Sequence, residues 1–272
     1  MPEAWTLTFN NLFFPIFCRQ CHYPLLTQEN GYFCPECWAL STRLEPPFCT
    51  VCGRPQAARL GFGAVENFPC PACRAAPAPP YRRVFGAVAY EGAIAEAIKL
   101  LKFHDRGRIA HLLAEIMAAF AEREMNCGQY DDLVPVPLHR VRRRARGFNQ
   151  AQLLAKELLP LFPRARLNQS LSRIRPTRTQ STIKDHKERL QNVVGAFAVD
   201  REENFDGRTV LLIDDVVTSG GTVSECAHAL LRAGAVHVDV LVAALPIEDS
   251  ESRPKQGRRE DARSIWSRFV TR

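Results

Sequence analysis

Two adjacent aspartates, Asp214 and Asp215, follow the apolar run 209–213 (TVLLI) and precede a loop of small residues at 218–222 (TSGGT). The apolar run predicts a strand buried on both faces, so the acids would lie at its carboxyl end, where parallel α/β sheets bind their ligands. Glycines in the loop allow close approach of the backbone, and N–H groups at the start of the next helix can surround a phosphate. Because carboxylates add nothing to the binding of phosphate alone, we expect a sugar phosphate whose vicinal hydroxyl groups donate to the acids.

An acidic strand end is also typical of P-loop ATPases, which are the main alternative. That class requires the pattern G-x-x-x-x-G-K-[ST], which the sequence lacks, and it contains no Gly-Lys dipeptide. The remaining alternative is a hydrophobic strand that ends in Asp-Asp by chance. The sequence favours the sugar-phosphate pocket over both.

Eight of the ten cysteines form four C-x-x-C pairs before residue 74. Twelve residues separate the first pair from the second, and seventeen separate the third from the fourth. Each C-x-x-C pair forms a tight turn, called a knuckle here, that directs two thiolates toward one point. Two knuckles supply the four thiolates of a tetrahedral zinc site, which leaves no coordination position for water. We therefore expect structural zinc, two ions in all, with iron as the alternative metal. The ligands would be Cys18, Cys21, Cys34, Cys37, Cys49, Cys52, Cys70 and Cys73.

Other uses of these cysteines are less compatible with the sequence. Disulfides are typical of secreted domains, and the N-terminal residues show neither a basic leader nor a small-residue cleavage site. A redox C-x-x-C needs one pair rather than four. The pairs can share metal in sequential order or interleaved, and the spacing leaves both open.

The pattern along the chain divides it into four parts. Residues 1–74 form the cysteine module, and 75–82 are a proline-rich linker for which we expect an extended conformation. Residues 83–246 alternate strand-like and helix-like segments, which predicts an α/β domain with a mainly parallel sheet. Residues 247–272 are a polar tail of mixed charge that we expect to be flexible.

The elements expected in the α/β domain follow from the apolar spacing. Strands are predicted within 83–90, 131–137, 195–199, 209–213 and 236–245, and helices within 92–103, 108–125, 147–162 and 222–235. No apolar stretch approaches the roughly 20 residues that span a bilayer, so we expect no membrane insertion.

Positive charge is concentrated in one part of the chain. The formal net charge is +7, yet residues 140–189 hold 14 Lys and Arg against 3 Asp and Glu, which leaves the rest near −4. Such a segment favours a polyanionic partner, with a solvated basic face as the alternative. Contacts to nucleic acid would come from the run 139–150 (HRVRRRARGFNQ), with its arginines Arg140, Arg142, Arg143, Arg144 and Arg146. Phe148 would either stack on a base or pack in the core.

The segments LLKF (100–103), VPVPL (134–138), RRRARGFNQAQLLA (142–155), RPTRTQ (175–180) and RLQNVVGAF (189–197) accompany the knuckles and the Asp-Asp motif in one order. As an ensemble over residues 18–245, they resemble the ComF/ComFC family of competence-associated, phosphoribosyltransferase-like proteins. Residues 210–222 resemble the motif that binds phosphoribosyl diphosphate (PRPP) in type I phosphoribosyltransferases, although the loop reads TSGGT where many relatives differ at Ser219 and Gly221.

The resemblance implies a cytoplasmic role in handling single-stranded DNA during natural transformation, beside a competence ATPase or helicase. It also implies a role for each matching residue in a PRPP pocket. Asp214 and Asp215 would accept from the ribose hydroxyls, and Lys102 would contact diphosphate. Thr179 and Gln180 would lie on a mobile loop, 175–192, that closes over PRPP. The 5′-phosphate would be held by Thr218, Ser219, Gly220, Gly221 and Thr222.

Two further interpretations remain open at this stage. The chain could be an active phosphoribosyltransferase of nucleotide salvage, with Mg²⁺ on the departing diphosphate and an unknown acceptor base. His104, His139 and His186 are candidates for a base by position only. Alternatively, it could be a zinc-ribbon interaction module on an inactive scaffold. The sequence does not determine the oligomeric state.

Overall fold

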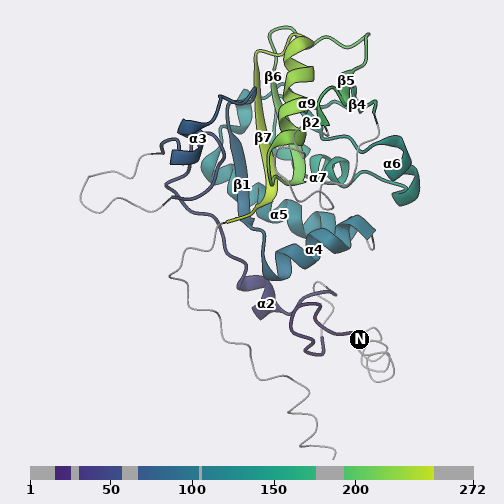
Figure 1. Cartoon of the computed structure of the whole chain (residues 1–272). Coiled ribbons are helices and arrows are strands. Elements are labelled where there is room, and N and C mark those ends of the chain that lie inside the picture. The colour runs from purple at the N-terminus through teal and green to yellow at the C-terminus, as the bar shows by residue number, and fades with distance from the viewer. Residues whose placement is uncertain (1–15, 26–30, 57–66, 104–105, 176–192, 248–272) are drawn as a thin grey trace, which may run out of the picture.

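A computed structural model describes residues 16–25, 31–56, 67–103, 106–175 and 193–247. Its centre is a sheet in the order β1-β7-β6-β2-β3, and every neighbouring pair is parallel (Figure 1). The strands are β1 (Val84–Ala89), β2 (Asp132–Pro135), β3 (Arg166–Leu167), β6 (Thr209–Val216) and β7 (His237–Leu245). The α/β class with a mainly parallel sheet is confirmed.

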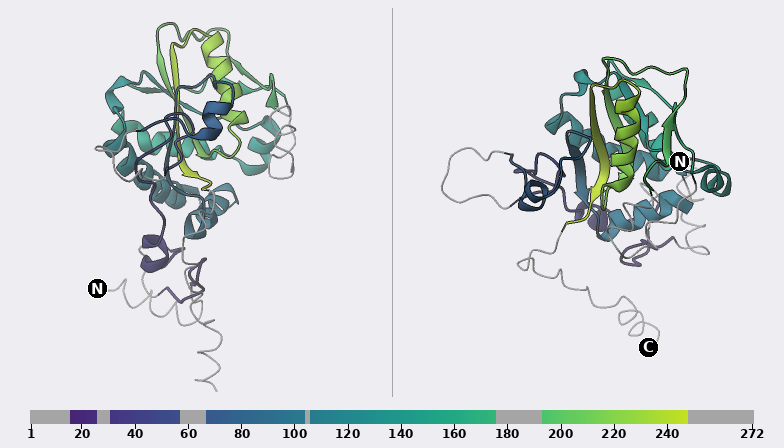
Figure 2. Two further views of the ribbon diagram at one scale, coloured as in Figure 1. Left: turned by 60° about the vertical axis from the view of Figure 1, so that its left-hand side comes forward. Right: turned by 45° about the horizontal axis from the view of Figure 1, so that its top comes forward.

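Helices cover both faces of this sheet. Within the described residues, the helices of the α/β domain are α4 (Gly92–Phe103), α5 (Arg106–Glu124), α6 (Arg140–Arg146), α7 (Gln150–Leu158) and α9 (Gly221–Arg232). Figure 2 shows α5 and α7 together on one face, with α9 on the other. Because helices lie on both sides, the central strands are buried on both faces, as the uninterrupted apolar run of β6 predicts.

A small antiparallel pair, β4 (Leu171–Arg173) and β5 (Phe197–Val199), lies beside α9 and outside the main sheet. The described part of the domain also contains 3₁₀ turns at Cys127–Gln129 and Leu159–Leu161. The strand expected within 195–199 therefore exists, but it pairs only with β4 among the described residues.

The short helices of the cysteine module begin at its knuckles. Helix α2 (Pro35–Ala39) is capped by the Cys34 side chain, and α3 (Pro71–Ala75) by that of Cys70. In both, proline occupies the first helical position, where its missing N–H costs nothing. Each knuckle thus turns the chain while aiming a sulfur inward.

The cysteine module is attached directly to β1. The Leu44 N–H donates to the Ala87 carbonyl at 3.1 Å, and the Ala89 N–H donates to the Thr42 carbonyl at 2.9 Å. Apolar side chains of the module, including Phe33, Leu44 and Phe48, belong to the same hydrophobic core as the sheet.

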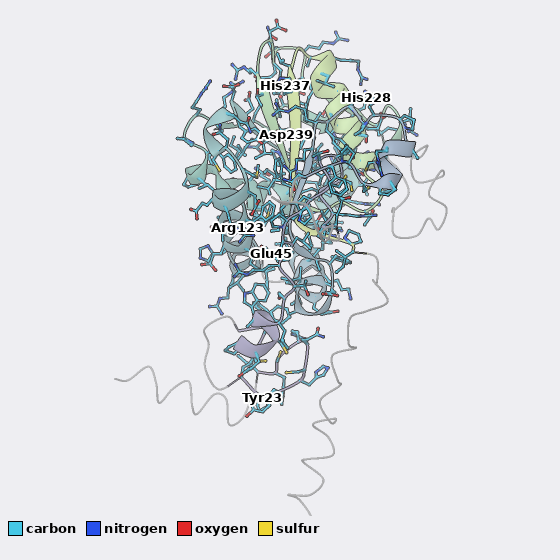
Figure 3. All side chains as sticks on the ribbon, turned by 90° about the vertical axis from the view of Figure 1, so that its left-hand side faces the viewer. Tyr23, Glu45, Arg123, His228, His237 and Asp239 are labelled. Atoms are coloured by element: carbon cyan, nitrogen blue, oxygen red, sulfur yellow. The ribbon has the colours of Figure 1, made fainter. Side chains whose placement is uncertain are left out.

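An ion pair also joins the module to the helices. Arg123 of α5 lies 3.5 Å from the Glu45 carboxylate (Figure 3). Figure 3 places Tyr23, in the first knuckle region, at the opposite end of the molecule from His237, which begins β7. None of the helices among the described residues is long and apolar enough to cross a membrane.

Two buried carboxylates within the strands of the sheet are paired with hydrogen-bond donors. Asp239 is buried and accepts from Arg82 at 2.6 Å and from the Tyr130 hydroxyl at 2.9 Å. Asp132, fully buried, accepts from Arg208 at 3.0 Å and from Asn168 at 3.0 Å. Buried carboxylates are tolerated when they are paired in this way, so these two acids have a structural role.

Candidate functional site

The Asp-Asp motif lies at the carboxyl end of β6, as predicted. Asp214 and Asp215 are in the last part of the strand, and the phosphate loop, residues 218–222, leads into α9. Gly220 has a φ of 77°, a left-handed conformation that favours glycine, and it caps α9 without a side-chain hydrogen bond. The loop therefore leaves the N–H groups of the first helical turn directed toward the strand end.

Lys102, from the last turn of α4, contacts the second aspartate. Its Nζ lies 2.6 Å from Asp215 Oδ2, and the Asp215 side chain is only 5% exposed. Burial lowers the pKa of Lys102, but the charge and hydrogen bond of Asp215 outweigh it and raise the pKa above its ordinary value. This contact joins residues that are 113 positions apart and places Lys102 in the lining of the same cavity as the aspartates, while its contact with diphosphate stays a prediction.

Asp214 is the more available of the two acids. Its Oδ1 accepts the Asp215 N–H at 2.9 Å, and burial followed by the charge of Asp215 raises its pKa well above the ordinary value. Asp214 is half-buried, lines the cavity and has no contact with Lys102 in the described structure, so it can accept from a ligand hydroxyl.

A cavity of about 570 Å³ opens over these residues. It is lined by both aspartates, Lys102 and three residues of the phosphate loop, namely Thr218, Gly220 and Thr222. Gly221 is buried as the first residue of α9, and Ser219 Oγ is buried without a hydrogen-bond partner among the described residues. Buried polar atoms usually have a hydrogen-bond partner, so the Ser219 hydroxyl of this loop fits a ligand that would supply the missing hydrogen bond.

The arginine run forms α6, and the helix divides the arginines between two environments. Arg142 and Arg146, four residues apart, line the cavity, whereas Arg140, Arg143 and Arg144 are exposed. The helix is capped by His139 at its start and by Gly147, with a φ of 76°, at its end. Phe148 beyond it is half-buried. The structure thus separates three outward arginines from two that face the acids.

Arg173 of β4 also lines the cavity, and sequence analysis did not single it out. Burial, followed by the charge of Arg142, lowers the pKa of Arg173, and the same two causes lower the pKa of Arg146. Four cationic groups therefore share the cavity with two carboxylates. An anionic ligand would offset the mutual repulsion of the guanidinium groups. The signal for Arg173 was weak, since one arginine on a three-residue strand carries no pattern.

Several predicted residues lie outside the described parts of the chain. These are Thr179 and Gln180, with most of the loop 175–192, and the histidines His104 and His186. The third histidine, His139, caps α6 through its Nδ1, which accepts from the Val141 N–H at 3.4 Å.

The cysteines gather in two clusters in sequential order, which settles the pairing that the spacing left open. The first cysteine cluster is Cys18, Cys21, Cys34 and Cys37, and the second is Cys49, Cys52, Cys70 and Cys73; the sulfurs of each lie within 4.8 Å of one another. Sulfurs at 3.7 Å (Cys21 to Cys34) and 4.0 Å (Cys52 to Cys70) match the spacing of about 3.8 Å in a tetrahedron with Zn–S bonds of about 2.3 Å.

Backbone N–H groups favour the thiolate form of one cysteine in each cluster. Burial alone would raise the pKa of Cys18 and Cys49, but backbone N–H groups outweigh it and lower the pKa to about 7 and about 6, respectively. Thiolate is the form that binds zinc, so both clusters fit structural zinc ions.

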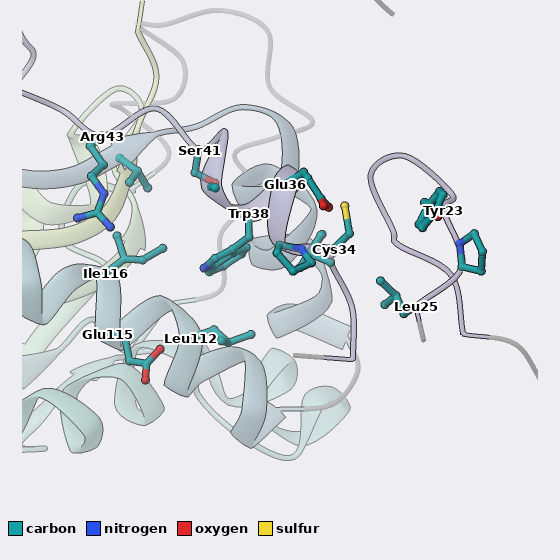
Figure 4. Close-up of a pocket in the computed structure, with 15 residues that line it drawn as sticks. Tyr23, Leu25, Cys34, Glu36, Trp38, Ser41, Arg43, Leu112, Glu115 and Ile116 are labelled. Carbon is teal, nitrogen blue, oxygen red and sulfur yellow. The ribbon is translucent and has the colours of Figure 1, made fainter. Parts of the chain in front are cut away.

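A second cavity, of about 610 Å³, shares no lining residue with the first (Figure 4). Trp38 and Ser41 of the cysteine module line one side, and Leu112 and Ile116 of α5 line the other. Its lining is mostly apolar, and of the residues singled out in the sequence only Cys34 belongs to it.

Comparison with known proteins finds two domain families in this chain. A model of the phosphoribosyl transferase domain matches residues 145–267, and a model of the double zinc ribbon domain matches residues 9–74. The DNA utilization protein YhgH of Salmonella typhimurium is 34% identical over 83% of this chain and 95% of that protein. The chain belongs to the ComF family.

Two further relatives carry competence names. Competence protein F of Haemophilus influenzae is 29% identical over 84% of this chain and 96% of that protein. Competence protein ComFC of Bacillus subtilis is 26% identical over 77% of this chain and 82% of that protein. This ComF protein is therefore a competence-related, phosphoribosyltransferase-like protein with two structural zinc sites.

Proposed function

We propose that this ComF protein handles incoming single-stranded DNA in the cytoplasm during natural transformation and carries a pocket for PRPP. The observation that supports the pocket most strongly is one cavity that joins Asp214, the phosphate loop and a set of buried or half-buried cations. The names of its relatives, DNA utilization and competence proteins, support the DNA role. A competence ATPase or helicase is the partner that this role implies.

In this proposal PRPP lies with its 5′-phosphate on the phosphate loop. The loop and the first N–H groups of α9 would hold the phosphate, since the N-terminus of a helix favours an anion. Asp214 would accept from a ribose hydroxyl, while Lys102 holds Asp215 in place. The diphosphate would lie toward Arg142, Arg146 and Arg173, the cations that line the same cavity.

Magnesium ion would neutralise charge on the diphosphate. Carboxylate oxygens are ligands that this ion accepts, and Asp214 is the carboxylate of the cavity that Lys102 does not occupy. The chain's own contribution is to bind and orient the sugar phosphate and to place cations around the leaving group.

An active transferase is the second candidate function, and the intact acid pair, Lys102 and phosphate loop favour it. The bond from the anomeric carbon to the diphosphate oxygen would break, the electron pair leaving with diphosphate, while a bond to a nitrogen of the acceptor base would form and that nitrogen would lose its proton to water. Release of diphosphate with one particular base would support this reading.

DNA binding would use the outward face of α6. Single-stranded DNA loses affinity with salt in proportion to the number of phosphates contacted, with a slope of about 0.7 per phosphate. Replacing Arg140, Arg143 and Arg144 by alanine should therefore weaken binding and reduce the slope by about two. The measurement is fluorescence anisotropy of a labelled oligonucleotide over a salt series.

The pocket variant Asp214→Asn separates the two roles. It should keep its affinity for DNA, because Asp214 lies in the cavity rather than on the outer face of α6. Unchanged binding and salt slope in the triple arginine variant would contradict the assignment of DNA to this face.

A further inference from the structure

The side chain of Tyr81 ends against the phosphate loop. A Cβ built on Gly220 would lie 3.2 Å from the Tyr81 hydroxyl oxygen, so the hydroxyl packs directly on the backbone of this turn. The hydroxyl is also hydrogen-bonded to the side chain of Ser224, whose N–H donates to the Gly220 carbonyl at 2.9 Å in the first turn of α9. Tyr81 does not line the cavity and supports its loop from outside.

The chain next to Tyr81 is fixed by the second cysteine cluster on one side and by the sheet on the other. The Val84 N–H donates to the Val51 carbonyl, within the third knuckle, at 2.9 Å. A Cβ on Gly53 would lie 2.1 Å from the Val84 carbonyl oxygen, so the knuckle and the start of β1 are in backbone contact. The Arg82 N–H donates to β7 at 2.9 Å. Movement of the knuckle would therefore be transmitted to the backbone beside Tyr81.

The charge of the second cysteine cluster also reaches Tyr81. Burial raises the pKa of Tyr81 to about 12, and the negative charges of Cys73, Cys52 and Cys49 contribute in the same direction, while the hydrogen bond with Ser224 opposes them. The phenol therefore stays protonated at neutral pH.

We infer that Tyr81 is a positioning residue through which the second cysteine cluster, with its zinc ion, holds the phosphate loop in its binding conformation. This inference rests on the proposed PRPP pocket. The two zinc sites would then differ in their effect on the phosphate loop. The first cysteine cluster adjoins α2, which contacts α4, and its Cys34 lines the second cavity. Because coupling between two binding sites is reciprocal, PRPP should in turn protect the second cluster against loss of zinc.

The test uses the full zinc-loaded chain, with and without PRPP and Mg²⁺. A zinc-selective chelator is added together with N-ethylmaleimide, and peptide mass spectrometry follows the alkylation of the two clusters separately. PRPP should slow alkylation of the second cluster by about threefold or more and leave the first unchanged, the size expected if one hydrogen bond carries the coupling.

The variant Tyr81→Phe removes only the hydroxyl. It should abolish this protection and weaken PRPP binding, measured by calorimetry on the same samples, by about three- to tenfold. Tyr23→Phe is the matched control, because this exposed tyrosine stands beside the first cysteine cluster and should change neither quantity.

The outcomes distinguish the inference from the proposed function. PRPP binding without selective protection of the second cluster, or full protection in Tyr81→Phe, overturns the inference and leaves the pocket standing. A lower melting temperature in Tyr81→Phe with unchanged PRPP affinity and protection shows a structural role only and also overturns it. No PRPP binding by the wild-type chain overturns the proposed function, and this inference with it.

Discussion

The contact between Lys102 and Asp215 can be tested by removing the lysine charge in the variant Lys102→Met. The Asp215 side chain is 5% exposed, so the variant leaves a buried carboxylate without its ammonium partner. Breaking a fully buried pair costs about 3–5 kcal/mol, and because Lys102 is itself 28% exposed we expect a smaller loss of about 2–3 kcal/mol. For a chain of this size, that loss lowers the melting temperature by about 5–10 °C.

The assay is thermal and urea unfolding of the zinc-loaded protein. Lys99→Met is the matched control on the same helix, because Lys99 is 59% exposed and its contact with Glu96 should be worth less than about 1 kcal/mol. The double variant Lys102→Met/Asp215→Asn should recover much of the loss, which gives the coupling energy between the two side chains. A loss in Lys102→Met no larger than in Lys99→Met, with no coupling, would refute the reasoning.

The pH dependence of this contact has a defined sign. Because the pKa of Lys102 is raised in the folded protein, its contribution to stability is fully present below the ordinary lysine pKa. The contribution is lost as the pH rises through the raised pKa. The difference in stability between wild type and Lys102→Met should therefore decrease on the alkaline side as the lysine loses its proton.

Two further predictions concern Asp214 and the zinc sites. Burial and the charge of Asp215 raise the pKa of Asp214, so the folded protein loses stability as the pH rises above the ordinary aspartate pKa. Asp214→Asn should therefore raise the melting temperature at pH 7 by a few degrees, at about 2–4 °C per kcal/mol. This gain should vanish in acid, where the carboxyl group is protonated in both the folded and the unfolded protein. Equal stability of the two proteins at pH 7 would contradict the burial of that charge. Cys49→Ser should reduce the zinc content from two ions per chain to one, whereas Cys127→Ser, outside both clusters, should keep two. Elemental analysis decides this, and two ions retained in Cys49→Ser would contradict the ligand assignment.

The sequence predicted those parts of the fold that have strong local patterns. The run at 209–213 is uninterrupted by charged residues and holds three β-branched residues, so it indicated a buried strand, and the acids after it lie at the expected edge of the sheet. The knuckle spacing indicated two metal sites, although only the fold shows that the pairs join in sequential order.

Features that depend on distant contacts or very short elements were not predictable. Helix α6 has seven residues, five of them arginine, and depends on its caps at His139 and Gly147 rather than on apolar spacing. Strand β3 has two residues, too few for any periodicity. Neither Arg173 in the cavity nor the contact of Lys102 with Asp215 follows from local pattern, because both arise from the packing of separate elements.

The most direct test of the account is calorimetric titration of PRPP with Mg²⁺ into the zinc-loaded wild type and into Asp214→Asn. Asp214 is the chosen position because the Lys102 contact, and with it the fold of the site, remains intact in this variant. We expect saturable binding of PRPP by the wild type, and this binding should be lost or greatly weakened in Asp214→Asn. Equal binding by both proteins would contradict the assigned pocket, and no binding by correctly folded wild type would contradict the PRPP function itself.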